Sequence, residues 1–239
     1  MIKIAVSQPT FLPWPGYFGL IDFCDYFIFL DSVQFERRSW HQSNFIKTSK
    51  GKHKLTLPIK SKGLYTQKIF ETEIFLDNKV FLNIPKTVQT YYSTTKYYLK
   101  YKKEFDSFFF NNQKNLSEFN IELIKFFCQL MKIKTKFFKS SKISTSGKKG
   151  ELIYNIINSF KFDDVEYYYT PGSEDYILKS SLFSKKRISL KKFIFTYPKH
   201  KQRFVDFVSD LSIIDIIFNE GPETSLEKIR NSVQIESIS

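Results

Sequence analysis

Two cysteines, eight glycines and eight prolines are all that this chain of 239 residues contains of those types. Cys24 and Cys128 each stand alone in an apolar stretch, without the spacing of a zinc site, so we expect buried thiols in a reducing compartment. Low glycine and proline content excludes a collagen-like or linker-like chain. No apolar run approaches the ~20 residues that cross a bilayer. The N-terminus also lacks the apolar region of a signal peptide, so the sequence predicts a soluble, cytoplasmic protein.

Several motifs of well-known enzyme classes are absent as well. The sequence has no GxGxxG, Walker, GxSxG or HExxH motif. It also lacks the pair of histidines that nucleotidyl-transferring α/β proteins often carry after their first strand; Tyr17 stands near that position. We therefore expect no cofactor and no metal ion, and we retain nucleotidyl transfer only as an alternative.

Lysine and aromatic residues are abundant. Aromatic residues make up 18% of the chain, and 37 basic residues against 24 acidic ones give a net charge of +13. The excess is concentrated in residues 84–150, which hold fourteen lysines and four acidic residues. Such a block suits phosphates, anionic lipid or nucleic acid. A lysine-rich helical surface in a protein from an AT-rich genome explains it equally well.

Strand and helix patterns alternate along the chain. We expect strands at residues 2–6, 25–31, 43–48, 53–60, 135–139, 165–170 and 188–197, and helices at 16–24, 79–92, 97–110, 115–131, 151–160 and 211–219. The first strand, helix and strand form a βαβ unit, which connects parallel strands. The pattern predicts one Rossmann-like α/β domain over residues 1–239 with a mainly parallel sheet and a helical, Lys-rich insertion at about 79–131. From about residue 223, after the Gly221-Pro222 helix stop, we expect a loose tail.

Ligands of such sheets bind beyond the carboxyl ends of the strands. Four predicted loops meet there: 8–16, 31–44, 171–176 and 198–202. The first holds three prolines within eight residues and ends at Gly16, where a helix begins that could face an anion. Its Trp14 and Phe11 could form an aromatic wall for a base or sugar, or could instead fill the core.

The second loop contains an adjacent arginine pair, Arg37 and Arg38, in a chain that otherwise uses lysine. The planar guanidinium suits phosphate or carboxylate better than an ammonium does. Asp31, at the end of a strand, could hold a ribose hydroxyl, act as a base or cap a turn. His200 follows another strand and could titrate near neutrality, although a lone histidine is more often a surface residue.

Asp215 and Asn219 lie four residues apart on an otherwise apolar helix and therefore face one direction. A buried polar pair needs partners, either structural or from a ligand.

The chain resembles the WbqC-like family in four stretches that occur in the same order: KIAVSQPTFLPWPGYF, DSVQFERRSWHQSNFIKT, LTLPIK and SDLSIIDIIFNEGP. The resemblance spans residues 2 to 222, and between 84 and 150 it is limited to helical character. Bacterial members accompany genes for O-antigen and other surface polysaccharides, so the resemblance implies a role in that pathway. The sequence departs from the family pattern at His200, where the family usually has tyrosine, at Ser43, where it has arginine, and at 171–174, where it has a glycine-rich turn.

The family pattern falls on a set of residues in the loops and the last helix: Gln8, Pro9, Leu12, Pro13, Trp14, Gly16, Tyr17, Asp31, Gln34, Arg38, Trp40, Asn44, Ile46, Lys47, Gln202, Ser212, Asp215, Asn219 and Gly221.

Our leading hypothesis is a transferase of surface-polysaccharide synthesis that moves an acyl or aminoacyl group to the amino group of a nucleotide-linked sugar. Asp31 or His200 would be the catalytic base. The expected substrate-binding residues are Gln8, Pro13, Trp14, Gly16, Tyr17, Gln34, Arg37, Arg38, Trp40, Asn44, Lys47, Gln202, Asp215 and Asn219.

The basic block would bind an acidic carrier, either acyl carrier protein or tRNA, or an anionic membrane surface; we expect no binding to DNA. The alternative is a non-catalytic binding module of the same pathway at the inner membrane face.

Overall fold

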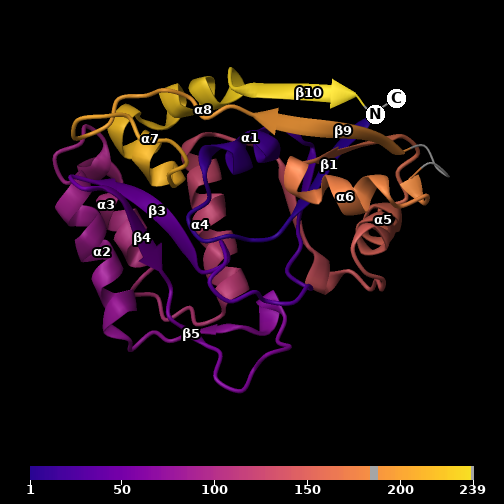
Figure 1. Ribbon diagram of the computed structural model, residues 1–239, viewed down its shortest axis with the longest axis horizontal. Coiled ribbons are helices and arrows are strands. Elements are labelled where there is room, and N and C mark those ends of the chain that lie inside the picture. The colour runs from indigo at the N-terminus through magenta and orange to yellow at the C-terminus, as the bar shows by residue number, and fades with distance from the viewer. Residues whose placement is uncertain (184–187, 238–239) are drawn as a thin grey trace.

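A computed structural model describes residues 1–183 and 188–237 (Figure 1). The chain begins with the expected βαβ unit, β1 (Ile2–Ser7), α1 (Pro15–Phe23) and β2 (Tyr26–Phe29). Pro15 occupies the first turn of α1, where its missing N–H costs nothing. β1 and β2 pair in parallel, with Ile4 opposite Tyr26, and this pairing starts the central sheet.

Within the described residues the central sheet has six strands in the order β10-β9-β8-β1-β2-β7. Its further strands are β7 (Lys136–Lys139), β8 (Val165–Tyr169), β9 (Ile188–Phe195) and β10 (Val233–Ser237). All neighbours are parallel except β9 and β10. The chain therefore has the expected Rossmann-like α/β architecture, and the loops after β1, β2, β8 and β9 all leave from one edge of the sheet.

Helices cover both faces of this sheet, as the alternation of side chains along each strand requires. Along β2, Phe27 and Phe29 face one core and Ile28 faces the other. The smaller core lies under α5 (Gly150–Ser159) and α6 (Glu174–Leu178). The larger core contains residues of α1, α7 (Ile213–Glu220) and α8 (Pro222–Arg230) together with the helical insertion.

The insertion holds the expected helices, α2 (Lys79–Tyr92), α3 (Tyr98–Ser107) and α4 (Leu116–Leu130). The side chains of Asn78 and Asn115 cap the first turns of α2 and α4. Before them come two small antiparallel sheets, β3 (Ser43–Thr48) with β4 (Gly51–Thr56), and β5 (Ile59–Lys60) with β6 (Glu73–Ile74). Short 3-10 turns lie at Ile69–Glu71, Ser140–Lys142 and Pro171–Ser173.

The expectation of a loose C-terminal tail is wrong. Gly221, with φ +86°, ends α7, and Pro222 begins α8 directly, so the Gly-Pro pair separates two helices instead of ending the fold. Leu226 and Ile229 of α8 are buried in the larger core, and β10 pairs with β9. Arg230 also binds Asp22 of α1 through two hydrogen bonds of 2.7 and 2.9 Å. The residues 171–176, expected as a loop, form a 3-10 turn and the start of α6.

Both cysteines are buried, as expected, and burial raises the pKa of each thiol. In the part of the chain that the structure describes, no helix has the length and apolar character needed to cross a bilayer.

Candidate functional site

The first two loops lie side by side at the carboxyl edge of the sheet. The backbone N–H of Phe11 donates to the carbonyl of Trp40 at 2.9 Å, and His41 Nε2 lies 2.9 Å from Gln8 Oε1. The side chain of Asn44 donates to the carbonyl of Leu12 at 2.7 Å. The parallel pairing of β1 and β2 thus brings the two loops together at one edge of the sheet.

A second amide completes this loop contact, and the sequence did not single it out. Asn120, fully buried on α4, donates to the carbonyls of Pro9 at 3.2 Å and His41 at 2.8 Å. An asparagine among the mostly apolar residues of the buried face of α4 was the available signal. Because Asn120 contacts both loops, it fixes the position of the two loops relative to the helical insertion.

His41 is a further positioning residue, and it was not among the predicted site residues. Its side chain is buried, and desolvation lowers its pKa to about 4, so the ring is neutral at neutral pH. The neutral ring accepts from the N–H of Glu36 through Nδ1 and donates to Gln8 through Nε2. His41 therefore connects the second loop to Gln8 of the first loop through hydrogen bonds of a neutral ring.

Between Glu36 and Ser43 the second loop folds into a compact turn with its cations outside. Ser39 donates to the carbonyl of Glu36, and the N–H of Arg38 donates to Gln42 Oε1. Arg38 adopts a positive φ of 61°, which this network holds in place. Arg37, Arg38 and Trp40 are all exposed, so the turn presents two guanidinium groups and an indole to solvent.

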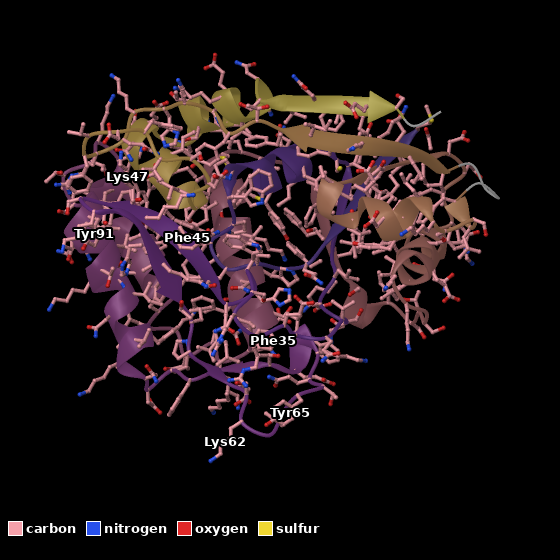
Figure 2. All side chains as sticks on the ribbon, in the orientation of Figure 1. Phe35, Phe45, Lys47, Lys62, Tyr65 and Tyr91 are labelled. Atoms are coloured by element: carbon pink, nitrogen blue, oxygen red, sulfur yellow. The ribbon has the colours of Figure 1, made fainter. Side chains whose placement is uncertain are left out.

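A hollow of about 480 Å³ lies next to this turn. Its lining consists of Arg37, Ile59, Lys60, Ser61, Lys62, Leu64, Tyr65 and Phe75. Figure 2 shows Lys62 and Tyr65 on the loop that projects from one end of the molecule, with Phe35 lying further inside. Gln34 fixes this loop because its side-chain amide donates to the carbonyl of Tyr65 at 2.9 Å.

The charge of the hollow is positive. Lys60 is paired with Glu73 at 3.0 Å, and hydrogen bonds from Lys60 and then Lys114 lower the pKa of Glu73. Neither Arg37 nor Lys62 forms an ion pair with any residue that the structure describes. The hollow therefore combines free cations with exposed aromatic surface, the two features that a nucleotide requires.

Asp31 lies in a closed cluster of serines. It is fully buried, and its carboxylate accepts from the hydroxyls of Ser117, Ser140 and Ser141 and from the N–H of Ser141, at 2.8–3.1 Å. These partners come from α4 and from the turn after β7. The carboxylate thus joins the end of β2 to two other elements, and both of its oxygens are occupied.

The buried carboxylate of Asp215 lies within hydrogen-bonding distance of side chains from α2 and from the loop after β9. His200 Nε2 lies 2.7 Å from Asp215 Oδ2, Gln202 donates to the same oxygen at 2.8 Å, and Tyr92 donates to Oδ1 at 2.7 Å. Burial and then Asp215 raise the pKa of Tyr92, which keeps its hydroxyl protonated. His200 Nδ1 faces the carbonyl of Pro198 at 3.1 Å, so both ring nitrogens have protein partners and the side chain is fully enclosed.

Lys47 extends this cluster. Its ammonium group donates to Gln202 Oε1 at 3.1 Å and to the carbonyls of Phe204 and Asp206. The side chain of Asn219 donates to the carbonyl of Asp215 at 2.7 Å, within α7. Lys47, Gln202, Asp215 and His200 therefore form one cluster, and residues 203–210 pass over it.

The aromatic residues of the first loop divide between core and surface. Phe11 is fully buried, whereas Trp14 is 38% exposed and packs edge-on against Phe195 with a centroid distance of 5.2 Å. A Cβ at Gly16 would lie 2.2 Å from the Trp14 ring, so only glycine lets the indole lie over the first turn of α1. Tyr17 is buried and donates to the carbonyl of Gln8 at 2.9 Å.

The structure thus separates the predicted site residues into groups. Gln8, Asn44 and Tyr17 hold the two loops, and the carbonyl of Pro13 accepts from the N–H of Ile213 at 2.8 Å. Asp31 and His200, the expected bases, lie in separate enclosed clusters. Gln34 and Arg37 border the hollow, with Arg38 and Trp40 exposed beside them.

Comparison with known proteins gives the family. The sequence profile of the WbqC-like protein family matches residues 8–227. The chain is also 30% identical over 226 residues to the uncharacterised protein Rv1507c of Mycobacterium tuberculosis (strain ATCC 25618 / H37Rv), a match that covers 93% of this chain and 96% of that protein. No solved structure gives a significant match. The chain belongs to the WbqC-like protein family, as its motifs predicted.

Replacing Asp31 by Asn will destabilise the protein strongly. The amide oxygen can keep the bond from the Ser141 N–H, but the new NH₂ group replaces Oδ2, so the hydroxyls of Ser117 and Ser141 lose a charged acceptor. We therefore expect a loss of about 2–4 kcal/mol of unfolding free energy. Asp25→Asn at the opposite end of β2 is the matched control, because its exposed carboxylate accepts from the N–H of Lys3. Urea denaturation measures both variants, and equal losses would contradict a structural role for Asp31.

His41 makes the stability of the fold sensitive to acid. Burial lowers its pKa to about 4 in the folded protein, below the ordinary histidine value of about 6.5, so the unfolded chain binds more protons between these values. The contribution is fully present above the unfolded pKa and is lost as the pH falls toward 4. Urea denaturation at pH 7 and pH 4.5 should show a loss of about 2 kcal/mol from this residue. The His41→Gln variant, although less stable at pH 7, should lack that part of the loss. If its stability depends on pH as that of the parent does, His41 is not the source of the acid sensitivity.

Proposed function

We propose that the chain binds a nucleotide-linked sugar in the hollow beside Arg37 and acts in the cytoplasm in bacterial surface-polysaccharide synthesis. The observation that carries the proposal is the joint presence of unpaired cations and exposed aromatic side chains around one hollow. Arg37 and Lys62 would bind the pyrophosphate, and Tyr65 and Phe75 would contact the base or the sugar. The pathway is proposed from the resemblance to WbqC-like proteins.

Transfer of an acyl or aminoacyl group to the sugar amine is the reaction we propose for this ligand. The amine nitrogen would attack the carbonyl carbon of the donor, forming a C–N bond while the bond from that carbon to its carrier oxygen or sulfur breaks. A base takes the proton from the amine and returns it to the leaving carrier atom. Acyl carrier protein or tRNA would be the carrier, because both are acidic and the lysines of residues 84–150 complement them.

The geometry supports binding more directly than catalysis. Asp31 and His200 are enclosed, and neither residue lines the hollow. The observation that favours catalysis is the 2.7 Å contact between His200 and Asp215, in which a carboxylate orients an imidazole. The pair lies apart from the hollow and the segment 202–210 covers it, so catalysis by His200 would require this segment to move aside and the sugar to pass from the hollow to His200.

Arg37 and Tyr65 test the ligand site. Thermal shift with a panel of nucleotide-linked amino sugars identifies the ligand, since a ligand of the folded state stabilises it by mass action. Calorimetry should then show about ten- to a hundredfold weaker binding for Arg37→Ala, the effect of one lost charge-assisted hydrogen bond. Tyr65→Ala should also weaken binding, whereas Lys79→Ala on α2 should not. Normal binding by the Arg37 and Tyr65 variants would place the ligand elsewhere.

His200 separates the transferase from the binding module. The identified sugar is incubated with acyl carrier protein or tRNA carrying the donor group, and mass spectrometry follows the acylated sugar. If the protein is a transferase that uses His200, the His200→Gln variant should keep its sugar affinity and lose product formation. Unchanged product formation in this variant would contradict the role of His200 as the base.

A further inference from the structure

The segment between β9 and α7 projects apolar side chains into solvent. Val205 is 86% exposed, and the adjacent Phe204 and Phe207 are 36% and 39% exposed. We call residues 203–207 the tip. A contiguous group of exposed apolar side chains marks a site of interaction with a protein or a membrane.

Buried groups hold the backbone of the tip. Phe204 and Asp206 have positive φ angles of 67° and 66°, which bulky residues adopt only when their surroundings impose them. The ammonium group of Lys47 donates to the carbonyls of both residues from inside the protein. Gln202 accepts from the N–H of Val208 at 2.9 Å. The fold therefore holds these apolar side chains in exposed positions.

Cations border the tip. Arg203 belongs to it, and its guanidinium donates to the carbonyl of Tyr91 at 2.8 Å while lying over the ring of Phe204. Lys52 on β4 lies 3.5 Å from Asp210, so the β3–β4 hairpin adjoins this segment, with the exposed Lys50 in its turn and the exposed Lys54 further along β4. Figure 2 shows Lys47 and Tyr91 at this corner of the molecule, and Figure 1 shows the segment before α7 passing over it.

We propose that the tip docks the protein on an anionic lipid bilayer. Apolar side chains at the tip would enter the interface between headgroups and acyl chains, and Arg203, Lys50 and Lys52 would attract the anionic headgroups. The most exposed apolar side chain of the tip, Val205, is aliphatic, and the rings of Phe204 and Phe207 already contact Arg203 and His200. The tip therefore suits lipid better than the stacked bases of a single-stranded nucleic acid. This surface lies outside the lysine block of residues 84–150, and the inference is independent of the sugar site.

Vesicle co-sedimentation of the full chain tests the proposal. We expect binding to vesicles of equal phosphatidylglycerol and phosphatidylcholine, weaker binding at higher salt, and little binding to phosphatidylcholine alone. The double variant Val205→Ser/Phe207→Ser should bind at least about fivefold more weakly, because it removes exposed apolar area that would enter the bilayer. Asp206→Asn should bind more tightly, since it removes a negative charge from the tip and asparagine tolerates a positive φ.

Leu99→Ser is the matched control, because Leu99 is 72% exposed on the lysine-rich helix α3. It should bind vesicles as the parent does. Melting temperatures of all variants, together with calorimetry for the nucleotide-linked sugar, show that the fold and the hollow are intact. The proposal fails if the parent does not bind anionic vesicles, if the tip variant binds like the parent, or if binding depends on Leu99 instead. Retention of the parent by single-stranded RNA but not by vesicles would equally overturn it.

Discussion

The carbonyl groups of the first loop impose the constraint on which the rest of the site depends. With prolines at 9, 13 and 15, this loop cannot form helix or sheet, yet most of it is buried. Buried carbonyls without donors would cost more than the fold could tolerate. Asn120 donates to Pro9, Asn44 donates to Leu12, and the N–H of Ile213 donates to Pro13. Three distant segments are thereby fixed to one loop.

Buried hydrogen bonds of this kind explain why many residues of the family pattern are buried in this structure. Asn44, Asp31 and Asp215 each connect a strand end or loop to elements far away in the sequence. The polar atoms of these side chains are hydrogen-bonded to other parts of the protein and are not exposed on the binding surface. The chemistry open to a ligand is carried by the turn with Arg37, Arg38 and Trp40 and by the adjacent loop with Lys62 and Tyr65. A rigid interior that presents exposed cations and aromatic rings suits recognition of a nucleotide-linked sugar.

Where apolar residues recur with a clear period, the sequence predicted the strands and helices correctly. The alternation of strands and helices indicated the parallel sheet, and the parallel βαβ start brought the two motif loops together. It did not predict α8 and β10, because Gly221-Pro222 ends one helix and begins the next with the same residues. It also could not show that Asp31 and His200 are enclosed, since burial depends on Ser117, Ser140 and Gln202, which are distant in sequence or chemically ordinary. The hollow involves residues 59–65, which carry no recognisable motif.

Hydrogen–deuterium exchange with and without a nucleotide-linked sugar tests the central claim most directly. The claim is that the ligand binds at the surface beside Arg37 and that the buried carboxylate clusters of Asp31 and Asp215 lie outside the binding surface. We expect the sugar to slow exchange in residues 34–38 and 59–68, while residues 198–219 exchange as in the free protein. Slower exchange over residues 8–16 and 198–219, with no change at 59–68, would place the ligand at the Asp215 cluster and contradict the account.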